Sequence, residues 1–307
     1  MATLYTEQSK NIKRTWILMT SFFVVIILLG WWLDYCFNNI YFLIVAVFVS
    51  ILLNFIAYFQ SDKIALSASG AVLADEKKYP ELYQIVENLC ITVGMPRPKI
   101  YIIKDASPNA FATGRDDKHS SIAYTTGLLE ILNRSEIEGV TAHELAHIRN
   151  RDILVATVVV VLVGIIAVVC DLAIRMSFRS SSNNNKGGVV VLIIGVVGVI
   201  LAPVVAKIIQ LSISRRREFL ADASGALMTR YPEGLASALE KISNIAKPMK
   251  KVSTATAHLF ITDPFAQPLQ SNAKNSNLAQ KDRGWFSHLF DTHPPTEERV
   301  KALLRHQ

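Results

Sequence analysis

The sequence predicts a mainly α-helical integral membrane protein with four transmembrane helices and a polar domain that carries a small β-sheet. Two observations support this fold class. The chain of 307 residues is 51% hydrophobic and has a mean hydropathy of +0.31, which is high for a soluble protein. Four apolar runs account for most of this hydropathy, and each is close to the roughly 20 residues that a helix needs to cross a bilayer. They cover residues 16–32, 41–59, 153–174 and 189–209.

The apolar runs divide the chain into two predicted membrane hairpins and two polar blocks. The first run ends in the aromatic stretch "GWW" and lacks a small-residue cleavage site, so we interpret it as a retained span rather than a signal peptide. The predicted order is an N-terminal hairpin (1–59), the first part of a polar domain (60–152), a second hairpin (153–209) and the second part of that domain (210–307).

The positions of the basic residues predict how the chain is oriented. A net charge of +7 would suit a nucleic-acid partner, but the basic residues flank the apolar runs. Lys10, Lys13 and Arg14 precede the first run, whereas the connection between the first two runs has neither Lys nor Arg. The positive-inside rule therefore predicts a cytoplasmic N-terminus, although basic residues between the third and fourth runs weaken the bias. We expect no nucleic-acid partner.

The polar blocks contain short helices and strands. The stretch 79–95 has the spacing of an amphipathic helix and ends near a glycine. Ser135 and Glu138 form a capping-box pattern, which predicts the start of the next helix. Alternating and β-branched residues predict three short strands of one sheet, at 99–104, 107–114 and 120–127. Helices are also expected at 214–230, 232–245 and 296–305.

The helix that follows Ser135 carries the motif H-E-x-x-H, formed by His143, Glu144 and His147. Positions i and i+4 lie on one face of a helix, so both imidazoles can reach a single metal ion. The glutamate beside the first histidine is placed to act as a general base toward water. This pattern predicts a zinc site with a hydrolytic function.

A third ligand is needed, because a catalytic zinc takes three protein ligands and keeps one position open. No histidine follows at the metzincin spacing, which leaves a carboxylate on another helix. Glu218 stands four residues before Asp222, so one helix face can offer Glu218 to the metal while Asp222 orients a ligand histidine. Two apolar runs, an even number, separate His147 from Glu218, so both residues would emerge on the same side of a membrane.

These motifs together resemble those of the HtpX-type membrane zinc metalloproteases, which are gluzincins related to the CAAX prenyl endopeptidases. The stretches that carry the resemblance are "SPNAFATG" and "HELAHIRNRD" between the two predicted hairpins, and "SRRREFLADASG" and "DTHPPTEERV" after the second hairpin. The resemblance implies a gluzincin-like domain with one zinc ion per chain, held by His143, His147 and Glu218, with Glu144 as the general base. It also implies protein quality control and stress response at the bacterial inner membrane, with the active site facing the cytoplasm.

The resemblance implies roles for further residues. An edge strand that binds extended substrate by strand addition would comprise Asn109, Ala110, Phe111 and Ala112. His293 would stabilise the oxyanion and Arg299 would support the site. From the residues alone, His258 and His288 are equally available for the role of His293.

The implied partners are polypeptide substrates, namely misfolded or membrane proteins, and membrane lipid; the oligomeric state stays open. Three other functions compete with this interpretation. A transporter is disfavoured because the apolar runs contain almost no ionisable residues. A prenyl-peptide endopeptidase would be expected to have more spans. An inactive protease-like scaffold would not need the complete set of ligands and base.

Overall fold

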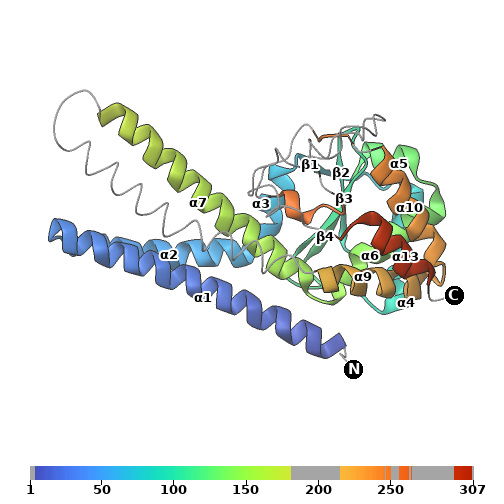
Figure 1. Cartoon of the computed structure of the whole chain (residues 1–307), viewed down its shortest axis with the longest axis horizontal. Helices are drawn as coiled ribbons and strands as arrows, with labels where there is room; N and C mark the ends of the chain where they lie inside the picture. Colours follow the sequence, from blue (N-terminus) through green and yellow to red (C-terminus); the bar gives the residue numbers. More distant parts are fainter. Residues whose placement is uncertain are drawn as a thin grey trace, which may run out of the picture.

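The computed structural model describes six stretches of the chain: residues 4–180, 215–245, 247–249, 256–262, 264 and 294–305. Within them the protein is mainly helical and contains one small mixed sheet. Figure 1 shows three long helices extending together from a compact part that contains the sheet and the shorter helices. The fourth predicted span and His293 lie outside the described residues.

Two of the long helices are apolar enough to cross a membrane. They are α1 (Leu4–Phe37) and α2 (Tyr41–Phe59); the candidate spans Gln8–Tyr35 and Tyr41–Phe59 contain 18-residue windows with mean hydropathies of 2.2 and 2.6. Many of their large apolar side chains are exposed, for example Phe48 at 68% and Phe55 at 56%. Such surface is costly in water and favourable in lipid, so these helices fit a membrane.

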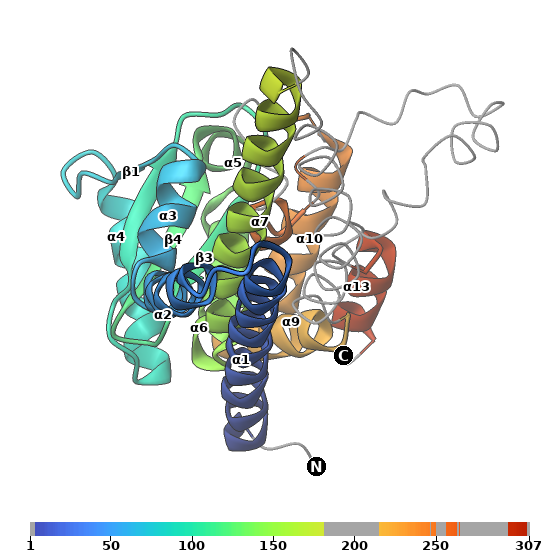
Figure 2. The ribbon, with the colours of Figure 1, turned by 90° about the vertical axis from the view of Figure 1, so that its left-hand side faces the viewer.

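The third predicted span lies within the helix α7 (Asp152–Ser180). The first turns of α7, however, are buried in the protein core. Val155, Val158 and Val159 are fully buried, and α7 packs against α1, α2 and β3. Figure 2 shows α7 in front of the compact part, with α1 extending below it. The described residues thus contain two of the four predicted spans as candidate membrane helices.

The sheet has the strand order β1-β2-β4-β3, with β2 and β4 parallel and both outer pairs antiparallel. The prediction of three strands in one sheet is confirmed, and the three-residue strand β1 was not predicted. Within the described residues β3 is an edge strand. The strands are β1 (Ala71–Leu73), β2 (Lys99–Ile103), β3 (Ala110–Gly114) and β4 (Ser120–Thr125).

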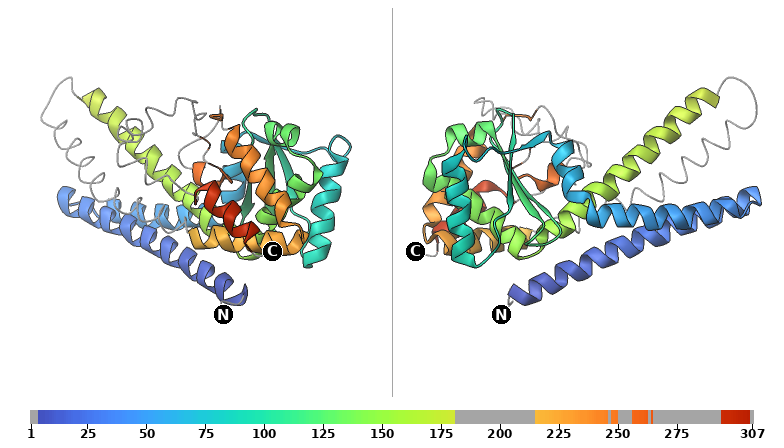
Figure 3. Two further views of the ribbon diagram at one scale, coloured as in Figure 1. Left: turned by 45° about the vertical axis from the view of Figure 1, so that its right-hand side comes forward. Right: turned by 180° about the vertical axis from the view of Figure 1, so that it is seen from behind.

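Each face of the sheet packs against its own set of helices, because successive side chains of a strand point to opposite faces. Ala112 and Ile122 contribute to the core under α4, α6 and α10, whereas Phe111 and Ala123 contribute to the core under α3 and α7. Figure 3 shows the strands between these two layers. The helices are α3 (Ser61–Ala68), α4 (Pro80–Val93), α5 (Thr126–Ile131), α6 (Arg134–Arg149), α9 (Arg215–Thr229), α10 (Pro232–Asn244) and α13 (Thr296–Leu304), with a short 3₁₀ turn η1 (Ala257–Leu259).

The start of α6 differs from the prediction. The N-cap is Asn133, whose side chain accepts from Glu136 N at 3.0 Å while the Glu136 carboxylate accepts from Asn133 N at 2.8 Å. The capping box therefore lies two residues earlier than the Ser135 and Glu138 pattern. Ser135 instead donates to the Asn133 side chain at 2.8 Å. A cap of this kind stabilises a helix by about 1 kcal/mol.

A sharp break separates α6 from α7. Arg151 has φ +61°, a left-handed conformation that non-glycine residues adopt rarely and at a cost of roughly 1–3 kcal/mol. Its guanidinium is held by Arg115 O at 3.4 Å and by Asp117 Oδ1 at 3.2 Å, both in the loop after β3. The break turns the chain so that Asp152, the first residue of α7, lies beside the histidine-bearing face of α6.

Candidate metal centre

The two histidines of α6 converge as their spacing predicts. His143 Nε2 and His147 Nε2 lie 3.2 Å apart, with the rings at 90° to each other. His143 and Glu144 are 1% and 3% exposed. Two ligands bound at about 2.0–2.1 Å with a tetrahedral angle lie about 3.3 Å apart, so the separation of the two nitrogens fits a shared metal ion.

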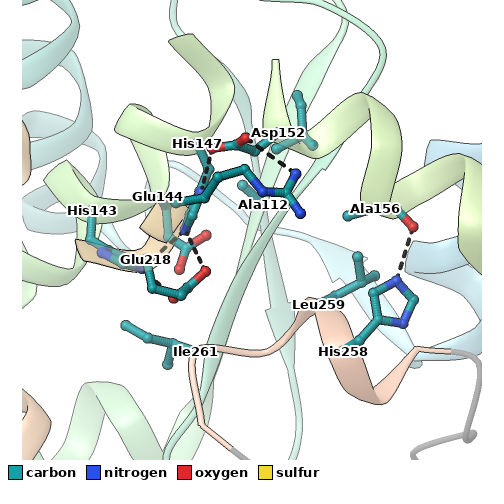
Figure 4. Close-up of a pocket in the computed structure, with 12 residues that line it drawn as sticks. Ala112, His143, Glu144, His147, Asp152, Ala156, Glu218, His258, Leu259 and Ile261 are labelled. Carbon is teal, nitrogen blue, oxygen red and sulfur yellow. Dashed lines mark hydrogen bonds and ion pairs between the residues drawn. The ribbon is translucent and has the colours of Figure 1, made fainter. Parts of the chain in front are cut away.

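Helix α9 adds the carboxylate of Glu218 to this pair. Glu218 Oε2 lies 3.7 Å from His143 Nε2, and Glu218 Oε1 lies 3.5 Å from His147 Nε2. The three ligand atoms all lie within 4.8 Å of one another. Figure 4 shows the three side chains pointing toward a common position, with Glu144 beside them. The described residues thus form a possible His-His-Glu metal site.

A glycine allows α9 to approach α6 this closely. A methyl group at Gly225 would lie 3.0 Å from the main-chain nitrogen of His143 and 3.3 Å from the carbonyl carbon of Ala142. Contacts this short would push the two helices apart. Because Glu218 and Asp222 are carried by α9, Gly225 lets both carboxylates reach the histidines.

His143 is supported by Asp222. Its Nδ1 lies 3.0 Å from Asp222 Oδ1, although no described residue offers it a well-aligned hydrogen bond. Arg299 holds Asp222 with two hydrogen bonds, from Nε at 2.8 Å and from Nη2 at 2.7 Å. Burial alone would raise the pKa of Asp222, but Arg299 and His143 outweigh it and lower the pKa to about 2. Asp222 is therefore a fixed negative charge behind His143.

His147 is supported by Asp152. Its Nδ1 lies 3.0 Å from Asp152 Oδ2, while Asp152 Oδ1 accepts from Asn11 Nδ2 at 2.7 Å and from Arg217 Nη1 at 3.4 Å. Burial alone would lower the pKa of His147, but the carboxylates of Glu218 and Asp152 raise it to about 9. The carboxylates around this buried imidazole thus favour a positive charge at its position.

The donor set and its charge fit a zinc ion. Two imidazole nitrogens and one carboxylate are the ligands of gluzincin-type sites, and each imidazole has a carboxylate oxygen 3.0 Å from its other nitrogen. A cavity of about 50 Å³ adjoins these atoms and has room for a few water molecules. Within the described residues, the arrangement suits a metal ion with an open, water-accessible position.

The edge of β3 borders the same cavity, at Ala112. Thr125 N donates to Asn109 O, which makes Asn109 and Thr125 a hydrogen-bonded pair of the antiparallel strands. Such pairs alternate along the strand with pairs that are not hydrogen-bonded to each other. The main-chain N–H and C=O groups of Ala110, Ala112 and Gly114 therefore point away from β4. Ile261 N donates to Ala110 O at 3.0 Å, and Gly114 N donates to Thr157 Oγ1 at 3.3 Å. Ala112 lies between these two contacts.

Of the other predicted site residues, the side chains of Asn109 and Phe111 lie away from the cavity, whereas Arg299 lies close to the metal ligands. Asn109 is 1% exposed and donates from its amide to Thr262 O at 3.0 Å, and Phe111 packs on Phe260 with ring centres 5.0 Å apart. Neither side chain lines the cavity. Arg299 lies within the site: its Nη2 is 3.4 Å from His143 Nε2, and its Nη1 is 3.9 Å from Glu218 Oε2.

Two residues at the site, Asp152 and Asn11, were not predicted from the sequence. Asp152 was placed at a boundary, because no helical period relates residues across the break at Arg151. Asn11, on α1, is separated from Asp152 by 141 positions in the sequence. His258 lines the cavity and contacts Ala156 O at 3.0 Å; it was only one of several candidate histidines in an irregular stretch.

Comparisons with known proteins identify the family. Residues 76–307 match Peptidase family M48. A "Protease HtpX homolog" of Caldanaerobacter subterraneus subsp. tengcongensis is 45% identical over 98% of this chain and 97% of its own, and one of Dictyoglomus turgidum is 41% identical over 98% and 94%. Among solved structures, the "Crystal Structure of S. mikatae Ste24p" is similar with a TM-score of 0.47 and 19% identity, covering 99% of this chain and 66% of that one. The match to M48 and the near-full-length relatives show that the chain belongs to the HtpX-type membrane metalloproteases of peptidase family M48.

Proposed function

We propose that the chain is a zinc-dependent endopeptidase in which His143, His147 and Glu218 bind one zinc ion. The observation that carries this proposal is the spacing of the ligand side chains: the two histidine Nε2 atoms lie 3.2 Å apart, and the carboxylate oxygens of Glu218 lie 3.5 and 3.7 Å from them. These separations are close to the value of about 3.3 Å for tetrahedral ligands at zinc distances. Two carboxylates, Asp222 and Asp152, hold the imidazoles in the orientation that binding requires.

Glu144 is the proposed general base. It is buried and follows His143 directly, so its carboxylate lies at the cavity where water and the peptide carbonyl must meet. A bound zinc ion supplies Lewis acidity, which polarises the carbonyl and makes water acidic near neutral pH. Glu144 accepts the proton from the attacking water and returns it to the departing amine. The nucleophile is water, so no side chain forms a covalent intermediate.

The proposed substrate is an extended polypeptide that pairs with the outer edge of β3. Main-chain pairing supplies affinity with little demand on sequence, which suits a protease of broad substrate range. Ala112 carries most of this role, because it borders the cavity while Ile261 and Thr157 occupy the edge on either side. The side chains of Asn109 and Phe111 act indirectly, by holding the strand in place.

The proposed cellular role is quality control of misfolded and membrane proteins, with stress response, at the bacterial inner membrane. We infer four spans, with the N-terminus and the active site in the cytoplasm. The inference rests on the charge pattern around the first two apolar runs, and on the even number of runs between His147 and Glu218. His293, which the family resemblance assigns to the oxyanion, remains part of the proposal.

The substitution Glu144→Gln tests the base directly. We expect the variant to bind zinc as the unsubstituted chain does and to lose about 10²–10⁴-fold in peptide hydrolysis, because the amide accepts no proton. The measurements are zinc content of the purified full-length protein and cleavage of unfolded casein with and without chelator. Turnover within twofold of the unsubstituted chain would rule out Glu144 as the base.

A further inference from the structure

We propose that Asn11, on the first membrane helix, is a positioning residue for the metal centre and acts through Asp152 on His147. This inference rests on the proposed zinc site and extends it to a helix outside the M48 match, which begins at residue 76. If it holds, α1 is part of the machinery that orients a metal ligand, in addition to any role as an anchor.

The contacts of Asn11 are specific and buried. Asn11 is 0% exposed, and its Nδ2 donates to Asn150 O at 2.9 Å and to Asp152 Oδ1 at 2.7 Å. Both partners are acceptors only, which fixes the orientation of the amide. Thr15 Oγ1 donates to Asn11 O at 3.0 Å one turn later. The amide of Asn11 therefore joins α1 by hydrogen bonds to the residues on either side of Arg151, between α6 and α7.

The carboxylate of Asp152 transmits this contact to the metal ligand. Asn11 and Arg217 contact one of its oxygens, and His147 Nδ1 contacts the other at 3.0 Å. A carboxylate held at one oxygen presents the second in a fixed direction, and the partner of an imidazole N–H sets the direction of its other nitrogen. Loss of the Asn11 hydrogen bond would free Asp152 to rotate toward Arg217, so that His147 Nε2 would no longer be aimed at the ion.

A neighbouring residue provides a matched control. Gln8, one turn earlier on α1, donates from Nε2 to Arg149 O at 2.6 Å, at the end of α6. It docks the same helix onto the same part of α6, and this hydrogen bond goes to a main-chain oxygen rather than to Asp152. A general loosening of α1 should therefore appear in a Gln8 variant, whereas an effect on zinc through Asp152 should appear in an Asn11 variant alone.

The experiment uses the full-length protein in detergent and compares Asn11→Leu with Gln8→Met. Zinc retention is measured by competition with a chromophoric chelator, and kcat and KM are measured on an unfolded protein substrate. We expect Asn11→Leu to weaken zinc retention by about 10–100-fold, as is typical when support for a ligand is lost, and to lower kcat more than it raises KM. Gln8→Met should stay within about twofold of the unsubstituted chain on the same scale.

A double-mutant cycle separates action through Asp152 from a structural effect. In an Asp152→Asn background the additional loss caused by Asn11→Leu should vanish, because the residue through which it acts is already changed. Zinc retention in Asn11→Leu equal to that in Gln8→Met, or a loss of undiminished size in the Asp152→Asn background, would overturn the inference. His147→Ala tests the underlying site separately: if that variant kept full zinc occupancy, the proposed metal centre itself would fail.

Discussion

The two histidines of the proposed metal centre lie beside carboxylates that are held by different parts of the chain. On the His143 side, Asp222 is 2% exposed and accepts two hydrogen bonds from Arg299. This support is therefore a contact between α9 and α13, both in the compact part of the protein. On the His147 side, Asp152 begins the long apolar helix α7 and takes its hydrogen bond from Asn11 of α1. One support is internal to the catalytic part, and the other joins it to the membrane helices.

The difference has a physical consequence. A buried ion pair such as Asp222 and Arg299 is strongly destabilising to break, because the remaining partner is left as an uncompensated charge. Asp152 is shared among Asn11, Arg217 and His147, so removing one contact leaves others in place. The His143 side should therefore control folding as well as metal binding. The His147 side should control metal binding with less effect on folding.

The largest effect is expected from breaking the His143 side with Arg299→Met. Asp222 would stay buried without its partner, so we expect a loss of about 3–5 kcal/mol in the free energy of unfolding together with loss of zinc. Chemical denaturation of the detergent-solubilised protein measures the first quantity and elemental analysis the second. Arg305→Met, at the exposed end of the same helix, is the control. Equal stability of the two variants would refute the account of this side.

A smaller effect on stability is expected from Asp152→Asn on the His147 side. The new amide nitrogen would face a donor on one side or the other, either Asn11 and Arg217 or His147 Nδ1. We expect zinc to bind about 10–100-fold more weakly, while the denaturation midpoint moves less than in Arg299→Met. Chelator competition gives the affinity. The contrast between the two sides would be lost if Asp152→Asn unfolded as readily as Arg299→Met.

The smallest effect is expected away from the metal, at Glu136, where α6 meets α10. Burial alone would raise the pKa of Glu136, but hydrogen bonds from Lys241, Ser237 and the Asn133 main chain outweigh it and lower the pKa. A carboxyl whose pKa is lower in the folded state adds stability above its unfolded pKa of about 4.3, and that stability is lost as the pH falls through the folded value.

Lys241→Met tests this contact and provides a baseline for the two sides of the metal centre. Because Lys241 is 42% exposed, we expect a loss of only about 1 kcal/mol at pH 7. The difference from the unsubstituted chain should shrink as the pH falls below the ordinary pKa of a glutamate, because Glu136 then takes up a proton in both proteins. Zinc retention at pH 7 should not change. An exposed lysine of α13, Lys301, gives the control variant, and a pH-independent difference for Lys241→Met would contradict the assignment.

Local patterns in the sequence were enough to predict much of the fold and the core of the site. Helical spacing placed His143 and His147 on one face of α6, and the four-residue spacing of Glu218 and Asp222 placed both on one face of α9. Strands were predicted from β-branched alternation, and the three predicted strands do form part of one sheet. Each of these features depends on neighbours within a few residues.

Features that depend on distant contacts could not be predicted in this way. The apolar run that starts at Ile153 has the composition of a membrane span, yet its first turns are buried against β3, α1 and α2, and hydropathy alone does not distinguish lipid from protein core. Asp152 reaches His147 only because Arg151 adopts φ +61° between two helices. Asn11 reaches the site through tertiary packing across 141 residues.

The most direct test of the account is X-ray absorption at the zinc edge on the purified full-length protein and on its His147→Ala variant. The account predicts one zinc ion per chain, with imidazole nitrogens and carboxylate or water oxygens at about 2.0–2.2 Å. The imidazole signal of the unsubstituted chain should correspond to two histidines, and zinc should be lost or its imidazole signal halved in the variant. A spectrum with sulfur ligands, or one that His147→Ala leaves unchanged, would contradict a metal centre built from His143, His147 and Glu218.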